Sequence, residues 1–272
     1  MRINHNITAL NTYNKLTANT SATAKSLEKL SSGLKINRAG DNAAGLAISE
    51  KMRGQIRGLD TASNNASDGI SLIKTAEGGL NETHSILQRM REIAVQSAND
   101  TNTDTDRDEL QKEIDQLTEE ITRIADNTQF NTKNLLDGGA DASGIIFHIG
   151  ANSGQSVSLT IGNMSAAGLS ISAVSVATQS GADAAITTIN TAIETVSSER
   201  AKLGAMQNRL EHTINNLDTS SENLSSAESR VRDVDMAKEM MEFTKNNILS
   251  QAAQSMLAQA NQQPQNVLQL LQ

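Results

Sequence analysis

A stripe of large apolar residues recurs every three or four positions between Ile186 and Val231. This spacing places the side chains along one face of an α-helix, and no proline interrupts it. At a rise of 1.5 Å per residue, a helix over this range is roughly 70 Å long. Because such a helix cannot shield its apolar face by itself, the stripe predicts a long antiparallel helical bundle or coiled-coil rod. The members of the stripe are Ile186, Ile189, Ile193, Val196, Leu203, Leu210, Ile214, Leu217, Leu224 and Val231.

Two segments nearer the N-terminus carry the same spacing and predict partner helices. Aromatic residues make up only 1% of the chain, which favours thin helical packing over one thick core. The single proline, Pro264, leaves nearly the whole chain free to be helical. The fold class that we expect is therefore mainly α. The spaced positions are Ile73, Ala76, Leu80, Leu87, Met90 and Ala94 in one segment, and Leu110, Ile114, Leu117, Ile121 and Ile124 in the other.

The middle of the chain, about residues 136–182, has a different character. A period-two alternation, with Ile146 and His148 before it and Val157, Leu159 and Ile161 after it, flanks the turn-rich sequence GANSGQ. This pattern predicts a small β-hairpin. The following Ser-, Ala- and Gly-rich stretch predicts loop or short strand.

The two ends of the chain predict a surface for assembly. Ile3, Ile7 and Leu10 begin a helical stripe that continues through the weak positions Asn14, Thr17 and Ser21, so an isolated N-terminal helix is marginal. Residues 251–272 are amphipathic and carry no charged side chain, which suits burial in an interface. The alternative is a surface helix docked on the chain's own core. The candidate assembly residues are Ile3, Ile7, Leu10, Ile248, Leu249, Met256, Leu257, Val267, Leu268 and Leu271.

No catalytic, metal or cofactor motif is complete. The sequence DTNTDTDRDELQ has acidic residues at the spacing of a calcium loop, but Thr105 stands where the turn needs glycine and Gln111 where a bidentate glutamate is needed. It predicts an acidic helix start instead. The net charge of −8 argues against nucleic acid and anionic membranes as partners. The N-terminal sequence does not indicate secretion by a signal peptide, and no apolar run approaches the length of a membrane span. We expect neither a cofactor nor enzyme activity.

Four stretches together resemble bacterial flagellin. They are RINHNITALNT at the start, LSSGLKINRAGDNAAGLAISEKMRGQIRGL at 30–59, RLEHTINNL at 209–217, and DVDMAKEMMEFTKNNILSQAAQSMLAQANQQPQNVLQLL at the end. The resemblance covers roughly residues 1–135 and 185–272. It implies a subunit of the extracellular flagellar filament that serves motility, with terminal segments that fold into an inner coiled coil on assembly.

The resemblance also implies domains and partners. The expected domains are 1–42 with 235–272 as the terminal coiled coil, 43–135 with 183–234 as the helical rod, and 136–182 as a variable segment. The implied partners are other copies of the chain, an export chaperone that holds the C-terminal segment, the flagellar type III export apparatus, and the filament cap and hook-junction proteins. Two alternatives are a hook-filament junction protein and a signalling or adhesin coiled coil, which would need a membrane anchor.

The sequence LQRMREIAVQ at 87–96 resembles the stretch of flagellins that a vertebrate Toll-like receptor senses. The resemblance implies Arg89, Ile93, Gln96 and Glu113 as receptor contacts, with Ile93 replacing the usual leucine. A further departure is Thr132, where the family commonly has glycine, and it predicts an altered turn.

Limited proteolysis tests the expectation that the ends order only on assembly. Brief protease treatment of monomer is expected to trim about residues 1–40 and 235–272 and to leave a resistant fragment that spans the middle, as measured by mass spectrometry. Ends that resist digestion as well as residues 186–231 do would contradict this expectation.

Overall fold

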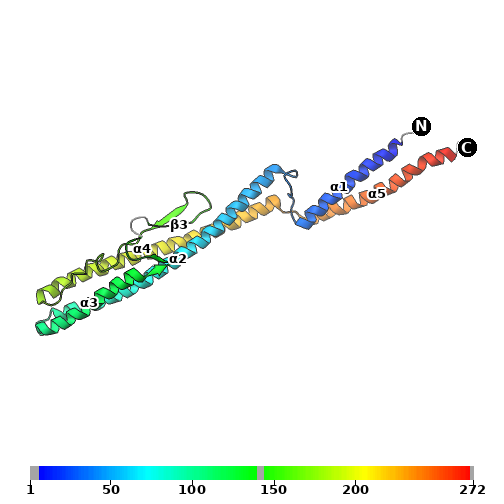
Figure 1. Ribbon diagram of the computed structural model, residues 1–272. Helices are drawn as coiled ribbons and strands as arrows, with labels where there is room; N and C mark the ends of the chain where they lie inside the picture. The colour runs from blue at the N-terminus through cyan, green and yellow to red at the C-terminus, as the bar shows by residue number, and fades with distance from the viewer. Residues whose placement is uncertain (1–5, 140–143, 270–272) are drawn as a thin grey trace. The chain divides into compact units, whose positions relative to one another are not determined.

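The computed structural model describes residues 6–139 and 144–269, with side chains up to Gln263. Within this part the fold is mainly helical, with two small antiparallel strand pairs, as the sequence predicted. Figure 1 shows the order of these elements along the chain. The helices are α1 (Ile7–Ser32), α2 (Ala43–Ser97), α3 (Asp104–Asn127), α4 (Gln179–Arg232) and α5 (Met236–Gln269), and the strands are β1 (Gln129–Phe130), β2 (Lys133–Asn134), β3 (Ile145–His148) and β4 (Ser156–Leu159).

The chain forms two compact units, and α2 and α4 each contribute to both. Unit 1 consists of Met1–Gly54 and Asn223–Gln272, and unit 2 of Gln55–Glu222. The domain boundaries expected from the sequence stay a prediction.

Unit 2 is built on the predicted apolar stripes. Within it α4 runs antiparallel to α2. Two hydrogen bonds show this direction, since Ser63 donates to Asp218 and Ser221 donates to Asp60. The members of the α4 stripe are all buried or half-buried, and the buried ones are Ile189, Val196, Leu203, Leu210 and Leu217. The corresponding stripes of α2 and α3 also lie in the core. Fully buried members with 0% or 1% exposure are Ile73, Leu80, Leu87, Met90, Ile114, Ile121, Ile189, Val196, Leu203 and Leu210.

The turn between α2 and α3 is held by helix caps. Thr103 and Asp106 form a capping box, in which each side chain accepts a hydrogen bond from the other residue's backbone N–H. Hydrogen bonds from the Thr103 hydroxyl and amide hold the pKa of Asp106 below its ordinary value. The buried guanidinium of Arg107 donates to the carbonyl oxygens of Ser97 and Asn99, at 3.0 and 3.3 Å. The acidic helix start that the sequence predicted is confirmed.

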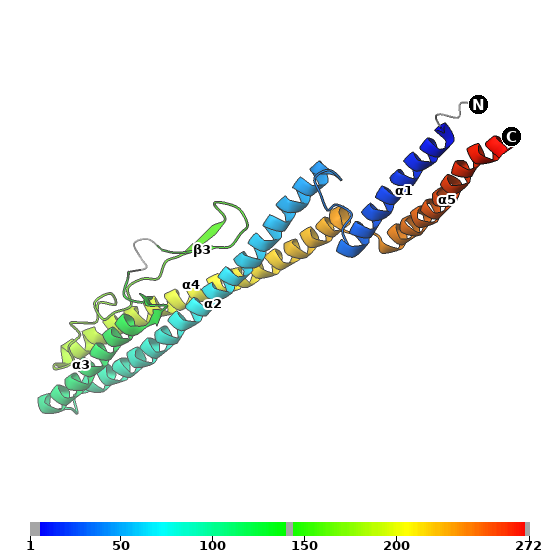
Figure 2. The ribbon, with the colours of Figure 1, turned by 45° about the vertical axis from the view of Figure 1, so that its right-hand side comes forward.

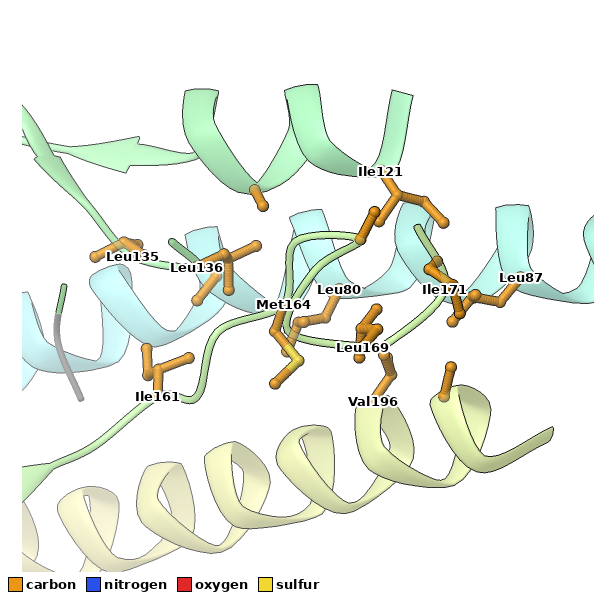
Figure 3. Packing of buried hydrophobic residues seen from close by; sticks show 14 of the residues in the cluster. Leu80, Leu87, Ile121, Leu135, Leu136, Ile161, Met164, Leu169, Ile171 and Val196 are labelled. Carbon is orange, nitrogen blue, oxygen red and sulfur yellow. The ribbon is translucent and has the colours of Figure 1, made fainter. Parts of the chain in front are cut away.

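The middle segment packs into the core of unit 2. Figure 3 shows Ile161, Met164, Leu169 and Ile171 on a loop between α2 and α4, where they face Leu80 and Val196. Gln111 of α3 holds this loop through its side-chain amide, which accepts from the Val176 N–H and donates to the Val174 carbonyl. The segment therefore completes the core that the helices alone leave open.

The predicted hairpin is present as β3 and β4, with Phe147 paired to Val157. On β3 the alternation of Ile146 and His148 does not mark the buried face. Ile146 is 66% exposed, and Phe147, at 9% exposure, points into the core instead. Sequence alternation cannot select the face here, because Ile145, Ile146 and Phe147 are all apolar.

In unit 1, α1 and α5 lie side by side and antiparallel, and Figure 2 shows this from a second angle. Asn6 caps α1 and donates a hydrogen bond to the Ala260 carbonyl at 2.8 Å. The seam between the helices is made mostly of small and polar side chains. Its positions are Ala9, Thr12, Leu16, Asn19, Thr23, Ser26 and Leu30 in α1, and Glu239, Phe243, Asn246, Ser250, Ala253, Leu257 and Ala260 in α5, all buried or half-buried.

The α1 stripe that includes Ile7 and Leu10 does not face α5. Asn14, Thr17 and Ser21, which continue that stripe, are exposed, as are Ile7 and Leu10 themselves. α5 packs instead against the neighbouring stripe, which includes Ala9, Thr12 and Leu16.

The two helix breaks of unit 1 pair with each other. α1 ends at Gly33, whose φ of 70° is the left-handed conformation that glycine adopts freely. Leu34 forms an antiparallel bridge with Asp233, and the Val234 N–H donates to the Gly33 carbonyl at 3.0 Å. These bonds tie the end of α1 to the start of α5, so the two helices enter their seam in a defined register.

Thr132, which departs from the family's usual glycine, lies in the two-residue turn between β1 and β2. Phe130 pairs with Lys133, and Asn131 and Thr132 have φ values of 49° and 64°. Positive φ at both central residues is the type I′ geometry, which favours Asn-Gly. The turn therefore has the type I′ form even with threonine at this position. Thr132 is β-branched and adopts a left-handed conformation that such residues rarely take.

Substitution of Thr132 by glycine is expected to stabilise unit 2 by about 1 kcal/mol, because glycine removes the left-handed strain. Urea unfolding followed by circular dichroism measures the change. Gly154, on the β3–β4 turn with φ 82°, supplies the reverse control: Gly154→Thr is expected to destabilise. A Thr132→Gly variant no more stable than the parent would contradict strain at this turn.

Candidate interaction surfaces

The largest apolar surface of unit 1 lies on the outer faces of α1 and α5. Nine large apolar side chains of these two helices are at least 49% exposed, which is unusual for helices of a stable monomer. They are Ile7, Leu10, Tyr13 and Leu27 in α1, and Met236, Met240, Met241, Ile248 and Met256 in α5, while Leu249 follows at 43%.

The exposed residues of α5 lie on several faces of the helix. Met241 and Ile248 are seven residues apart, as are Leu249 and Met256, so each pair forms its own stripe. Neither stripe coincides with the seam against α1, which contains Ala253 and Ala260. α5 therefore has apolar surface for more helical neighbours than unit 1 provides.

The C-terminal part of this surface lacks charge. After Lys245 the chain contains no Lys, Arg, Asp or Glu. Burying Ile248, Leu249 and Met256 therefore requires no charged group of the same stretch to lose its water, which would otherwise oppose association. This combination of large apolar and uncharged polar residues is typical of a surface that becomes buried in an assembly.

The structure separates the predicted assembly residues into groups. Ile7, Leu10, Ile248, Leu249 and Met256 are exposed and available to a partner. Leu257 is half-buried in the seam with α1, so it already has a partner within the chain. Ile3 and Leu271, together with the side chains of Val267 and Leu268, lie outside the described residues. The prediction did not include Met236, Met240 and Met241, which are also exposed. Their helical spacing, four residues from Met236 to Met240 and seven from Met241 to Ile248, could have indicated them.

A second surface, in unit 2, centres on Arg89 of α2. Its guanidinium donates to Glu113 of α3 at 2.9 Å and to Glu92 at 3.3 Å. Hydrogen bonds from Arg89 to Glu113, and then to Glu92, raise the pKa of Arg89 above its ordinary value. The group is half-exposed, so it stays charged and accessible to a partner.

Next to Arg89 the outer face of α2 carries a shallow hollow of about 510 Å³. It is lined by Gln88, Arg91, Glu92, Val95 and Gln96. Val95 is 52% exposed and supplies an apolar spot among polar side chains. The predicted contact residues Arg89, Gln96 and Glu113 are thus on or near one accessible patch.

Ile93 does not belong to this patch. Its side chain is 0% exposed and lies in the core of unit 2. The expectation of a direct contact at Ile93 is contradicted, because a partner cannot reach a fully buried side chain. Ile93 follows Met90 by three positions on the core-facing stripe, and this spacing was the signal for its burial.

The described residues contain no cluster of metal-ligating side chains. Across 6–139 and 144–269, no three His, Asp or Glu side chains converge as metal ligands. In the same part of the chain, no helix has the length and apolarity to cross a bilayer.

Comparison with known proteins decides what kind of chain carries these surfaces. The bacterial flagellin N-terminal helical region matches residues 3–141, and the C-terminal helical region matches residues 186–271. The chain belongs to the bacterial flagellin family. It is similar to the flagellins of Bacillus subtilis and Halalkalibacterium halodurans, at 58% and 60% identity over the whole of each chain.

Solved structures agree with this assignment. The crystal structure of Bacillus cereus flagellin has a TM-score of 0.52 and 34% identity, and the match covers 61% of this chain and 94% of that one. A putative flagellar hook-associated protein from Vibrio parahaemolyticus has a TM-score of 0.59 at 12% identity, covering 71% of this chain and all of that one, which shows a shared fold alone. The flagellin resemblance seen in the sequence is confirmed. This flagellin is a structural protein of the extracellular flagellar filament and not an enzyme.

Proposed function

We propose that this flagellin polymerises into the filament through the exposed apolar faces of α1 and α5. The proposal rests on the difference in composition between the seam of α1 with α5 and the exposed faces of the same two helices. Within the chain the two helices meet mostly through small and polar residues, while nine of their large apolar side chains remain exposed. Each large side chain contributes about 1.5–3 kcal/mol when it is fully buried, so contacts between subunits supply what the seam lacks.

The same difference supports ordering on assembly. A helix pair whose seam contains Asn19, Ser26, Asn246 and Ser250 buries little apolar area against the conformational entropy of its backbone. The terminal helices are therefore the least stable part of the monomer, and neighbouring subunits complete their packing.

Weakly stabilised ends also suit passage through an export channel. The proposal includes delivery by the flagellar type III export apparatus, with an export chaperone that covers the uncharged C-terminal segment before assembly. Shielding of this segment prevents premature association of its apolar faces. The filament cap and hook-junction proteins are the proposed partners at the two ends of the filament.

The patch around Arg89 is proposed to be the surface that the vertebrate flagellin-sensing Toll-like receptor reads in monomer. Arg89 and Glu113 form a half-exposed charge pair whose groups can make charge-assisted hydrogen bonds to a partner. Gln96 and the apolar Val95 extend the patch along α2.

The alternative of a hook-filament junction protein is less well supported. The Vibrio parahaemolyticus protein shares the fold but only 12% of the sequence. Full-length identities of 58% and 60% to flagellins favour the filament subunit.

Substitution of Ile248 by aspartate tests the polymerisation surface. Ile248 is 61% exposed and outside the seam, whereas a change at Leu257 would also disturb the pairing of α1 with α5. The variant is expected to keep the parental thermal transition and to form no sedimenting polymer on filament seeds, because a charge in the interface costs several kcal/mol.

Ile146→Asp provides the matched control, since Ile146 is 66% exposed on β3 and lies outside the proposed surface. This control is expected to polymerise like the parent. Normal filament growth by Ile248→Asp would exclude this face of α5. A lowered melting temperature would instead place Ile248 in the monomer's own core.

Substitution of Arg89 by alanine tests the receptor patch. Activation of receptor-bearing reporter cells is expected to weaken, while circular dichroism of the monomer stays unchanged because exposed ion pairs contribute little stability. Arg123→Ala is the control, since Arg123 forms a similar exposed pair with Glu120 on α3. Equal activation by the parent and Arg89→Ala at limiting protein would remove Arg89 from the patch.

A further inference from the structure

The methionines of this flagellin differ in exposure, with Met52 and Met206 half-buried between the two extremes. Four of the nine lie on α5, and all four are highly exposed: Met236 at 50%, Met240 at 49%, Met241 at 68% and Met256 at 59%. Met90 and Met164, in unit 2, are 0% and 3% exposed. An exposed thioether is open to oxidants, whereas a buried one is shielded by its neighbours.

The four exposed methionines are spread around the free surface of α5. Successive residues are turned by 100° along a helix, so Met236 and Met240 share one face while Met241 and Met256 lie on two others. Met241 belongs to the stripe with Ile248, and Met256 to the stripe with Leu249. Each face of α5 that is available to a neighbouring subunit therefore carries a methionine.

We propose that Met236, Met240, Met241 and Met256 form a peroxide-sensitive modification site, whose oxidation stops polymerisation of the monomer. The inference rests on the proposed assembly through α1 and α5. It adds to that proposal a chemical control on subunits that have not yet been assembled.

The chemistry requires only a peroxide as co-reactant. A sulfur lone pair of the thioether attacks one oxygen of hydrogen peroxide, a new S–O bond forms, and the O–O bond breaks. The sulfide is oxidised to the sulfoxide, the peroxide is reduced, and proton transfer releases the second oxygen as water. Methionine sulfoxide is reversible by dedicated reductases, so the block can be relieved.

The change in polarity explains the effect on assembly. A thioether packs as a flexible apolar group, while a sulfoxide is polar and accepts hydrogen bonds from water. Burying the sulfoxide against an apolar neighbour removes that water without a replacement. Around Met256 α5 offers no cation to compensate it, since the chain has none after Lys245.

The experiment compares parent monomer with a variant in which all four methionines are replaced by leucine. Both are treated with hydrogen peroxide, freed of oxidant with catalase, and added to untreated filament seeds. Peptide mass spectrometry reports which methionines are oxidised, and light scattering reports elongation. Leucine has a similar volume and apolar character to methionine, so the variant is expected to elongate seeds before treatment.

Treated parent is expected to carry sulfoxide at the four α5 positions well before Met90 or Met164, and its elongation rate is expected to fall about tenfold or more. The leucine variant is expected to keep its rate. A methionine sulfoxide reductase with its thiol reductant is expected to restore the parent.

Three results would overturn the inference. One is oxidation of all methionines at equal rates, the second is unchanged elongation of fully oxidised parent, and the third is equal peroxide sensitivity of the leucine variant. Failure of untreated parent to elongate seeds is a separate result, which would contradict the proposed assembly itself. Should the quadruple variant not elongate before treatment, Met241→Leu alone supplies the comparison, with a partial gain in peroxide resistance expected.

Discussion

Burial of the three-four-spaced apolar stripes of α2, α3 and α4 is the interaction on which unit 2 depends. None of these helices can hide its stripe alone, and the antiparallel arrangement lets each cover the others. The middle segment fills the remaining space with Ile161, Met164, Leu169 and Ile171. Because the core needs this segment, its role in the fold is structural even though it contains little regular secondary structure.

Unit 1 follows a different principle. The pairing of α1 with α5 has a defined register, set by the Leu34–Asp233 bridge at one end and by Asn6 with Ala260 at the other. Its seam, however, consists mostly of small and polar side chains, and most of the large apolar side chains of the two helices are exposed. A helix pair with specific geometry and low stability suits a subunit that must remain soluble before assembly and order afterwards.

The exposed faces of α5 take part in the proposed assembly, the proposed shielding during export and the proposed oxidation by peroxide. The stretch of α5 after Lys245 is uncharged and can be buried without loss of charge hydration, and it exposes Met256 before burial. The patch around Arg89 has the opposite character, since its charge pair stays solvated and suits recognition by a polar partner. Under the proposed function, the two kinds of surface serve two kinds of contact.

The sequence alone determined the helices, the β3–β4 hairpin, the acidic start of α3 and the flagellin assignment, because periodicity, turn chemistry and motifs act over short distances. Tertiary structure decided which face each partner covers. α1 presents Ala9, Thr12 and Leu16 to α5 rather than its larger residues, Phe147 replaces Ile146 in the core, and Ile93 is buried beside the proposed receptor patch. Spacing shows which residues share a face, but only packing between elements distant in sequence shows what covers that face.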